Sequence, residues 1–563
     1  MSNVAESEQT EKAYATAIVQ RVRRARSRRS SWEQLWQDIA DRVFPRYGSS
    51  FNGARVAAGT KRTDKMLDTT AGQGLLRFGA ALEYMLTPRT QTWHRLRASD
   101  PGLNKSRRVQ EWFHTVNGIL FQQRYSPRAN FASVQAESYL SLGAFGVGSY
   151  LVDGPAEDHL KGLRYKGLAL ADVYFEQNFQ GIIDTAFRFF KLSARQAVQQ
   201  FGREKLPANI EAVIKQSEEK PGSTDVDNEQ FEFVHLIEPR RDYNKERADA
   251  KGMPFKSCYA SVDDPTILSE GGYTTFPIPI NRDVTLPGEV YAYSPASWAL
   301  GNIKTLNEQK RVMLKQGQRA VDPILLAADD GIVDAFNLEP GSINAGGVNA
   351  QGQPLVRRLD DGANVALGFE MMDIERKAIN DFFLVNIFQI LTDTPQMTAT
   401  EVMERVREKG ALLTPTMGRQ QSEGLGPLIE REIDVLSRQG MLPPPPGELV
   451  EADGDFQIEY DSPLARAQKA EEAAGFSRLM EVTTMYAQAT GDQSVFDRIN
   501  FDAAVPDLAW TYAVPPHYIN DDATVQQKRD GRQQQQGVET AIQAAPAVAG
   551  LMKAAQPTGK PKA

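Results

Sequence analysis

The stretch between residues 296 and 391 constrains the fold of this chain more than any other segment. Residues 296–320 and 370–391 each carry apolar side chains at helical spacing, and each would form a helix roughly 35 Å long. Between them, residues 323–367 are rich in Gly and Asp, in combinations that are typical of tight turns between short strands. The sequence therefore predicts two long helices that enclose a small β-rich insertion.

The second helix of this pair becomes apolar on all sides in its last turns, since almost every residue from Phe382 to Leu391 is apolar. A helix of this kind must be buried all round. Because a peripheral helix lacks cover from its own chain, we expect neighbouring subunits to cover it. Packing between subunits is expected for Phe382, Phe383 and Phe388.

A short polar loop follows this helix. Pro395 ends the helix because proline has no N–H to donate and restricts the residue before it. Thr398 and Glu401 have the spacing of a capping box, which starts the next helical stretch, residues 400–438. That stretch is expected to kink or break at Gly418, Gly424, Gly426 and Pro427.

The rest of the chain predicts an α+β fold that is mainly helical. Helices are expected at residues 69–86, 109–122 and 130–144. Strands are expected after them, at residues 148–152, 165–168, 173–175, 183–189, 231–238, 256–261 and 273–278. A strand at 456–460 and helices from 464 to about 488 follow, and the tail from about residue 522 has the composition of a disordered segment.

Residues 1–30 form a polar arm that ends in six arginines within the nine residues 21–29. Two interpretations of these arginines stay open. They are typical of a surface for nucleic acid or for a membrane. They are equally typical of the solvated face of a helix that runs on into Trp32, Leu35 and Trp36.

Composition limits the classes of protein to which the chain can belong. The formal net charge is −8, whereas a protein that grips phosphates is basic at least locally, so DNA would slide past this chain and would not be clamped. The single cysteine, Cys258, excludes a disulfide framework and indicates a reducing cytoplasm. We expect no secretory signal and no membrane insertion, because the longest apolar run is about half of the roughly 20 residues that cross a bilayer.

The common enzyme motifs are absent. Residues 53–61 have the wrong spacing for a phosphate-binding loop, and residues 143–148 reverse the glycine order of a dinucleotide fingerprint and instead favour close packing or a turn. The five histidines are scattered. The pairs Asp329-Asp330 and Asp360-Asp361 each precede Gly, which favours a turn over a metal site. We expect no catalytic residue, no cofactor and no metal.

Several segments of the chain resemble the head-to-tail connector (portal) proteins of short-tailed, podovirus-type bacteriophages. They are residues 32–41 with Pro45-Arg46, 141–148, 397–402 and 462–468, and the resemblance covers about residues 30–490. Their order and spacing together carry it. The resemblance implies a dodecameric ring at one capsid vertex of the virion, made in the host bacterial cytoplasm, through which double-stranded DNA is packaged and later ejected.

The resemblance also implies a division of the chain into wing, stem, clip and crown. The wing comprises residues 31–290 and 399–462. The implied stem comprises 291–321 and 368–392, the clip 322–367, the channel loop 393–398 and the crown 463–520. The arm (1–30) and a flexible tail (521–563) lie outside this division.

The partners that the resemblance implies are the terminase large subunit, major capsid and scaffolding proteins, and tail adaptor or nozzle proteins. DNA in the channel would pass the loop residues Asp393, Thr394, Gln396 and Met397. The stem would contact DNA, or form ion pairs between subunits, through Lys315, Arg319, Arg376 and Lys377. Terminase and tail would dock on the clip, through Asp329, Asp330, Arg357 and Arg358.

Two other functions remain as alternatives. One is another ring-forming phage structural protein such as a tail adaptor, which the long helix pair argues against. The other is a nucleotide-driven DNA translocase, which the missing phosphate-binding loop argues against.

Overall fold

The structure, a computed structural model, describes residues 2–45, 51, 63–155, 160–219, 225–322, 324–327, 337, 339, 341–343, 347–359, 365–385, 416–452, 454–461, 463–511, 514, 518–520 and 524–535. It mixes helices and strands and is mainly helical, which confirms the α+β class. The chain forms two compact units, the first from residues 1–93 and 120–442 and the second from 94–119 and 443–563.

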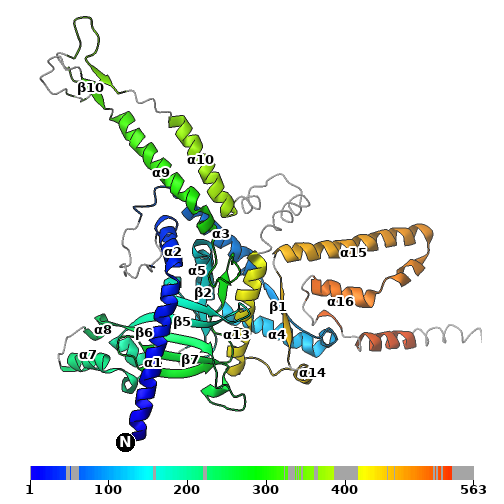
Figure 1. The fold of residues 1–563 in the computed structure, drawn as a ribbon. Coiled ribbons are helices and arrows are strands. Elements are labelled where there is room, and N and C mark those ends of the chain that lie inside the picture. Colours follow the sequence, from blue (N-terminus) through cyan, green and yellow to red (C-terminus); the bar gives the residue numbers. More distant parts are fainter. Residues whose placement is uncertain are drawn as a thin grey trace, which may run out of the picture. The chain divides into compact units, whose positions relative to one another are not determined.

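The largest sheet of the first unit has five antiparallel strands in the order β4-β5-β6-β7-β8 (Figure 1). They are β4 (Val173–Gln177), β5 (Ile183–Ser193), β6 (Gln230–Pro239), β7 (Phe255–Ser261) and β8 (Ile267–Tyr273). Side chains alternate between the two faces of a strand. Phe233 accordingly packs with α6 (Ala194–Phe201) and α7 (Ala208–Glu219), while Val234 and Leu236 pack with α1 (Ser2–Arg28). The expected strand at 273–278 is wrong, because β8 ends at Tyr273.

The polar arm is a helix, in line with the second of the two interpretations left open for its arginines. Helix α1 crosses one face of the five-stranded sheet (Figure 1) and buries Ile18, Val22 and Ala25 there. The side chain of Arg21 pairs with Glu176 and Glu238 on the strands beneath. The apolar stripe of α1, which packs on the sheet, and the ion pairs of Arg21 thus hold this helix in place.

A smaller sheet, β3-β2-β9, lies next to the helices that form the centre of the first unit. It comprises β2 (Val147–Asp153), β3 (Arg164–Gly167) and β9 (Ile280–Arg282). The helices are α2 (Ser30–Arg42), α3 (Thr70–Leu86) and α5 (Phe131–Phe145), and the last two confirm the helices expected at 69–86 and 130–144.

The glycines at 143–148 serve close packing and a turn, as the sequence predicts. A Cβ on Gly143 would lie 2.7 Å from Leu75 and 2.8 Å from Phe78, so this glycine lets α5 approach α3. Gly146 ends α5 with a φ of 80°, in the left-handed region that glycine adopts readily.

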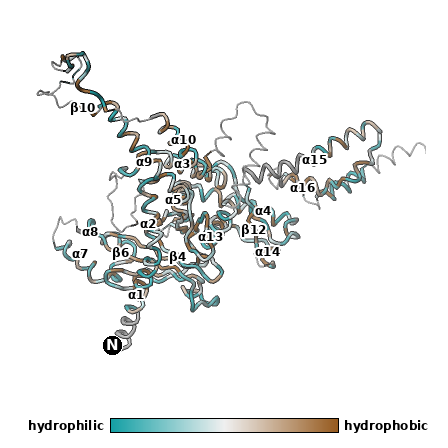
Figure 2. Tube along the Cα trace, turned by 45° about the horizontal axis from the view of Figure 1, so that its top comes forward, coloured by the Kyte–Doolittle hydropathy of each residue, from teal (hydrophilic) through white to brown (hydrophobic). Residues whose placement is uncertain are grey.

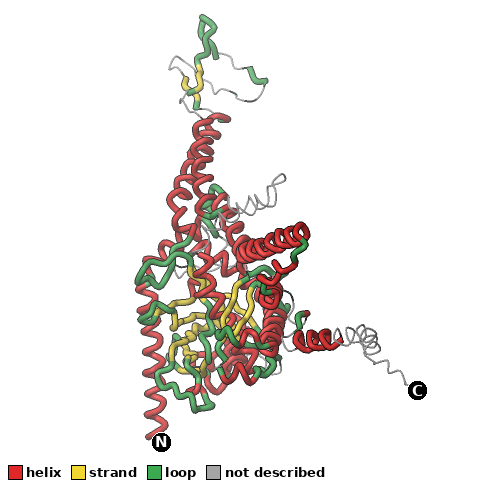
Figure 3. The backbone as a smooth tube through the Cα atoms, turned by 90° about the vertical axis from the view of Figure 1, so that its right-hand side faces the viewer, coloured by secondary structure: helices red, strands yellow, loops and turns green. Residues whose placement is uncertain are grey.

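Two long helices, α9 (Pro295–Val321) and α10 (Val365–Phe382), run side by side and lead to a two-stranded ladder (Figures 1 and 3). The ladder pairs β10 (Leu325–Ala327) with β11 (Val356–Arg358). The expected helix pair and β insertion are therefore present. Helix α10 ends at Phe382, earlier than the predicted Leu391, and residues 386–391 lie outside the described part of the chain.

The chain is described again from Thr416, in a helical segment that includes a π-helical turn, η5 (Gln420–Leu425), and continues as α13 (Gly426–Arg438). The irregularity falls where the sequence predicts a kink. The remaining short elements of this unit are η2 (Leu170–Asp172), η3 (Arg203–Lys205), α8 (Asp225–Asn228) and η4 (Ala250–Gly252).

The second unit joins two distant parts of the chain, because β1 (His94–Ala98) pairs antiparallel with β12 (Phe456–Tyr460). Its other elements are η1 (Leu103–Lys105), most of α4 (Arg107–Arg124), α14 (Gly447–Glu451), α15 (Pro463–Thr490), η6 (Gln493–Arg498) and α16 (Phe501–Thr511). Residues 524–535, expected to be flexible, are helical, and Arg529 pairs with Asp502 of α16 at 2.5 Å. Residues 536–563 lie outside the described part.

Candidate functional site: the paired helices α9 and α10

Helix α9 begins inside the core of the first unit. Ser294 and Ser297 form a capping box, Pro295 occupies the first turn, and the Ser294 hydroxyl donates to the carbonyl of Ala144 at 2.8 Å. The first turns bury apolar residues, namely Ala296, Ala299, Leu300, Ile303 and Leu306. Only the first half of α9 is therefore held by the core, and the second half extends beyond it.

Asn307 marks the point where α9 leaves the core. Its side-chain oxygen accepts hydrogen bonds from the backbone amides of Leu67 and Asp68, at 2.8 and 3.0 Å. Its amide nitrogen donates to the carbonyl of Ile303. The buried Asn307 side chain thus ties α9 to the segment before α3.

Asp68 links both long helices to that same segment. One carboxylate oxygen accepts from the amide and hydroxyl of Thr70, and the other accepts from Lys310 of α9 at 3.2 Å and Arg376 of α10 at 2.9 Å. Burial alone would raise the pKa of Asp68, but the Thr70 hydrogen bonds and the two cations hold that pKa well below its usual range. Asp68 is therefore ionised at neutral pH and clamps the two helices together.

Helix α10 is fixed at its end by Phe383, which is fully buried. A Cβ on Gly74 of α3 would lie 2.9 Å from the Phe383 ring, so the ring rests directly on the glycine backbone. Phe383 was expected to pack between subunits, and this is wrong because the core of its own chain encloses it. Leu384 then takes a φ of 56°, which turns the chain out of the helix.

Asn307, Asp68 and Phe383 together form the anchor of the helix pair on the core. Away from this anchor, α9 and α10 expose many apolar side chains. Hydrophobic and hydrophilic residues alternate along both helices (Figure 2), and Val312, Phe369 and Ile374 are exposed by 62, 54 and 65%. Phe382 is 42% exposed. An open groove of about 600 Å³ lies between the helices, lined by Lys304, Thr305, Glu308, Gln309, Val312, Met313, Gly368 and Met371.

The four predicted stem cations do not share one environment. Lys315, Arg319 and Lys377 are exposed. Arg376 instead pairs with Asp68 and with Asp373 of its own chain, both at 2.9 Å. Its pairing within the chain makes Arg376 part of the anchor.

At the far end of the helix pair, the β10–β11 ladder carries Arg357 and Arg358, both exposed, which are the cross-strand partners of Leu326 and Leu325. The other predicted clip residues, Asp329 and Asp330, lie outside the described residues. So do Phe388 and the expected channel-loop residues Asp393, Thr394, Gln396 and Met397.

Where the chain is described again, near Thr416, it is attached to β9 and the segment after it. Thr416 donates to the Asp283 carboxylate at 3.2 Å, and Gln420 donates to the carbonyl of Arg282. Burial raises the pKa of Asp283 to about 6. This attachment fixes one end of the segment that contains the expected channel loop.

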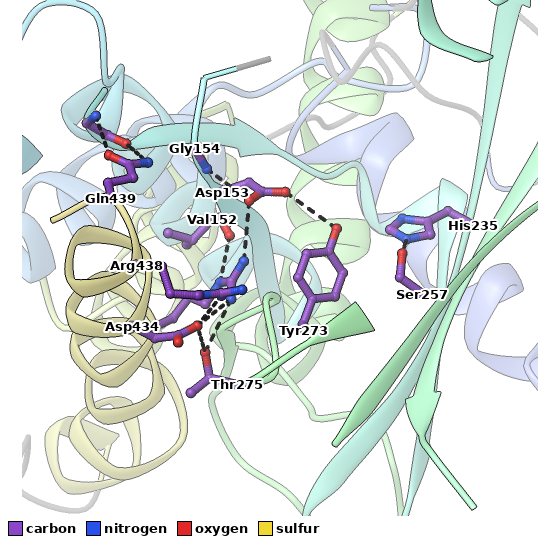
Figure 4. A network of polar contacts seen from close by, with 12 residues as sticks. Val152, Asp153, Gly154, His235, Ser257, Tyr273, Thr275, Asp434, Arg438 and Gln439 are labelled. Carbon is purple, nitrogen blue, oxygen red and sulfur yellow. Dashed lines mark hydrogen bonds and ion pairs between the residues drawn. The ribbon is translucent and has the colours of Figure 1, made fainter. Parts of the chain in front are cut away.

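Helix α13 is held by a polar network that sequence analysis did not identify (Figure 4). The buried Arg431 guanidinium donates to the carbonyl of Val152 and to Asp434, and it lies over the Tyr273 ring at 4.8 Å. Nearby, Glu432 accepts from the fully buried Arg124 and from the Tyr165 hydroxyl. Apart from the Arg431–Asp434 pair within α13, the partners are far apart in sequence, so no local pattern signals them.

The described residues form neither a metal site nor a membrane-spanning helix. In them, no group of three or more His, Cys, Asp or Glu side chains is placed to hold a metal ion. None of the helices described there is long and apolar enough to cross a bilayer.

The sequence is similar to known bacteriophage proteins over almost its whole length. A family model described as bacteriophage head to tail connecting protein matches residues 15–519. The chain is 29% identical to the probable portal protein of Bordetella phage BPP-1, over 94% of this chain and 93% of that protein. It is 26% identical to the portal protein of Salmonella phage epsilon15, over 96% and 94% of the two chains.

Proposed function

The chain belongs to the family of bacteriophage head-to-tail connecting proteins, and from this premise we propose that copies of it close into a dodecameric portal ring. The ring occupies one capsid vertex of the virion. Double-stranded DNA is packaged and later ejected through its central channel. Subunits are made in the host bacterial cytoplasm before they join the capsid.

The observation that supports this proposal most directly is the apolar surface of the helix pair. The exposed set on α9 and α10 is Trp298, Val312, Leu314, Val321, Leu367, Phe369, Met371, Ile374 and Phe382. A concentration of large exposed apolar side chains on one pair of helices indicates an interface. Neighbouring copies of the same helix pair would cover it.

The attachment of the helix pair to the core explains why successive contacts between subunits would have the same geometry. Asp68 and Asn307 fix the direction of both helices relative to the core of the first unit. Each subunit therefore presents the same surface at the same angle. A head-to-tail contact that repeats with a fixed rotation generates a closed ring when twelve such rotations complete one full turn without translation along the axis, and a filament otherwise.

Within this ring, α9 and α10 form the stem and the β10–β11 region forms the clip. The loop with Asp393, Thr394, Gln396 and Met397 lines the channel, and Lys315, Arg319 and Lys377 are candidate contacts for passing DNA. The clip, through Asp329, Asp330, Arg357 and Arg358, docks the terminase large subunit and later the tail adaptor or nozzle proteins. The wing contacts the major capsid and scaffolding proteins.

Native mass spectrometry with negative-stain imaging tests the proposal. Twelve copies of the 62.5 kDa chain give about 750 kDa and a particle with a central hole. The double substitution Phe369→Glu with Ile374→Glu should shift the protein to smaller species, since it places two charges on the apolar surface. The control is Phe179→Glu with Ile182→Glu, two apolar residues in the β4–β5 turn that are exposed by 95 and 59%, which should leave the ring intact.

A wild-type protein that stays monomeric or dimeric across salt concentrations, even with capsid and scaffolding proteins added, would contradict the proposal. If the Phe369/Ile374 variant formed rings with the mass and shape of the wild-type ring, the helix pair would not be the interface between subunits.

A further inference from the structure

The C-terminal half of α1 is fixed on the body of the first unit by two arginines. Arg21 donates to Glu176 and Glu238, each at 2.5 Å. Arg29 is buried, donates to the carbonyls of Leu170 and Ala171, and lies over the Tyr174 ring at 3.7 Å. Together with the buried apolar stripe, these contacts make the other side of the helix a rigid surface.

That other side has an unusual composition. From residue 20 to residue 34 the exposed positions are Gln20, Arg23, Arg24, Arg26, Ser27, Arg28, Ser30, Ser31 and Gln34. Every one of these side chains can donate a hydrogen bond, and the set contains neither an acidic nor an apolar residue. In a chain of net charge −8, this face, which we call the α1 basic face, is a local concentration of positive charge.

Within the described residues, three of the four arginines of the α1 basic face are left without an ionic partner, and the fourth has a distant one. In the described structure Arg23, Arg24 and Arg26 have no ion pair. Arg28 is 74% exposed and approaches Glu176 only at 3.9 Å. Glu33, which follows on α2, is occupied by Arg29 at 2.9 Å. The guanidinium groups are therefore available to an external anion.

We propose that the α1 basic face binds the phosphate backbone of double-stranded DNA without reading its sequence. Arg, Ser and Gln are residues that commonly donate to phosphate and sugar oxygens. Residues 20, 24 and 27 lie along one line of the α1 surface, with Arg23 and Arg28 on either side of it, and Ser31 follows at the start of α2. This arrangement offers donors at several successive positions, as a repeating backbone requires.

Two other kinds of partner, an anionic membrane and an acidic protein, fit the α1 basic face less well. A basic helix that binds a membrane inserts its apolar face into the lipid, whereas Ile18, Val22 and Ala25 of α1 are buried against the sheet. A protein interface has an apolar core, and the α1 basic face has no exposed apolar side chain between residues 20 and 34. The α1 basic face therefore lacks the apolar contacts that a membrane or a protein partner needs.

This contact does not rest on ring formation, since it uses one helix of one subunit. The test measures binding of the whole protein to a fluorescent 30-base-pair duplex of random sequence, over a series of salt concentrations. The variant carries Arg→Gln at positions 23, 24, 26 and 28. The control carries Arg→Gln at four exposed arginines that are ion-paired within the chain, Arg89, Arg107, Arg203 and Arg247, and so has the same net charge.

The α1 variant should bind at least about tenfold more weakly, and the slope of log K against log salt should fall by about 3 to 4, because each phosphate contact contributes about 0.9. The control should keep the wild-type slope. Arg→Lys at the same four α1 positions should restore most of the binding. A thermal unfolding curve like that of the wild type shows that the variant is folded.

Three results would overturn the proposal. The first is equal duplex binding by the wild type and the α1 variant, or no binding by either. The second is an equal loss in the control, which would assign binding to net charge. The third is displacement of the duplex by poly-glutamate of equal charge, or binding to anionic phosphatidylglycerol vesicles at the same strength, which would point to an acidic protein or a membrane as the partner.

Discussion

Replacing Asp68 by Asn tests whether one carboxylate sets the attachment of both long helices. The substitution keeps the shape of the side chain and an oxygen that can accept from Thr70. It removes the negative charge that faces Lys310 and Arg376. Both helices should then open from the segment before α3 more often, while the rest of the first unit keeps its stability.

The magnitude follows from the two lost ion pairs. A hydrogen bond to a charged group contributes about 1.5–3 kcal/mol. The Lys310 and Arg376 side chains are 32 and 33% exposed, so screening reduces each contribution to about 1 kcal/mol. The total is about 2 kcal/mol, or about a 30-fold change in an opening equilibrium.

Hydrogen exchange is the assay, because it reports opening of α10 separately from global unfolding. Amides of residues 365–382 should exchange about 30-fold faster in the variant, while amides of α7 (208–219) stay unchanged. Both proteins must be compared in the same assembly state. The matched control is Asp373→Asn, since Asp373 contacts the same Arg376 but is 63% exposed and should contribute less than about 0.5 kcal/mol.

The pH dependence gives a second check on the same reasoning. The folded-state pKa of Asp68 lies below its unfolded value, so its stabilisation is present above about pH 4 and is lost as the pH falls further. The exchange difference should therefore shrink in acid. Equal exchange in Asp68→Asn and wild type at pH 7, or an equal effect of Asp373→Asn, would refute the role given to Asp68.

Two further substitutions test the packing at the ends of the helix pair and its neighbouring segment. Gly74→Ala should destabilise the protein by about 1–3 kcal/mol in thermal or urea unfolding, because the new Cβ meets the Phe383 ring at 2.9 Å; Gly118→Ala, where nothing lies within 4 Å, should not. Asp283→Asn should stabilise the protein above pH 6, where burial makes the ionised carboxylate unfavourable, by up to about 3 kcal/mol. That gain should disappear near pH 4, and a gain that is independent of pH would contradict the raised pKa.

The sequence was most informative where local signals coincide. Ser294 and Pro295 at the start of α9, and its apolar spacing, predict the helix within a few residues. The glycines around 143–148 predict close packing in the same way. At the start of α9 the capping contacts are made by neighbours in the sequence. At Gly143 the neighbouring helix is distant, but the glycine itself indicates a close approach.

The errors occur where distant residues decide the structure. The apolar run after Phe382 favours a longer helix, but Phe383 turns into a space that Gly74 leaves open, and α10 ends. The choice between the two interpretations of residues 21–29 also depended on distant residues, since α1 packs on a sheet whose strands begin at Val173. The Asp68 clamp joins side chains 242 and 308 positions apart, and no local pattern can reveal such a pair.

The pairing of β1 with β12 has a consequence for synthesis of the chain. Arg95 of β1 and Asp461, which follows β12, are joined by a hydrogen bond and are 366 positions apart. At about 5–20 residues per second, β1 leaves the ribosome about 20 to 70 s before its partner strand. During that interval its edge offers unpaired N–H and C=O groups to any other strand. The second unit is therefore the last to fold, and a nascent chain that stops before residue 456 cannot form it.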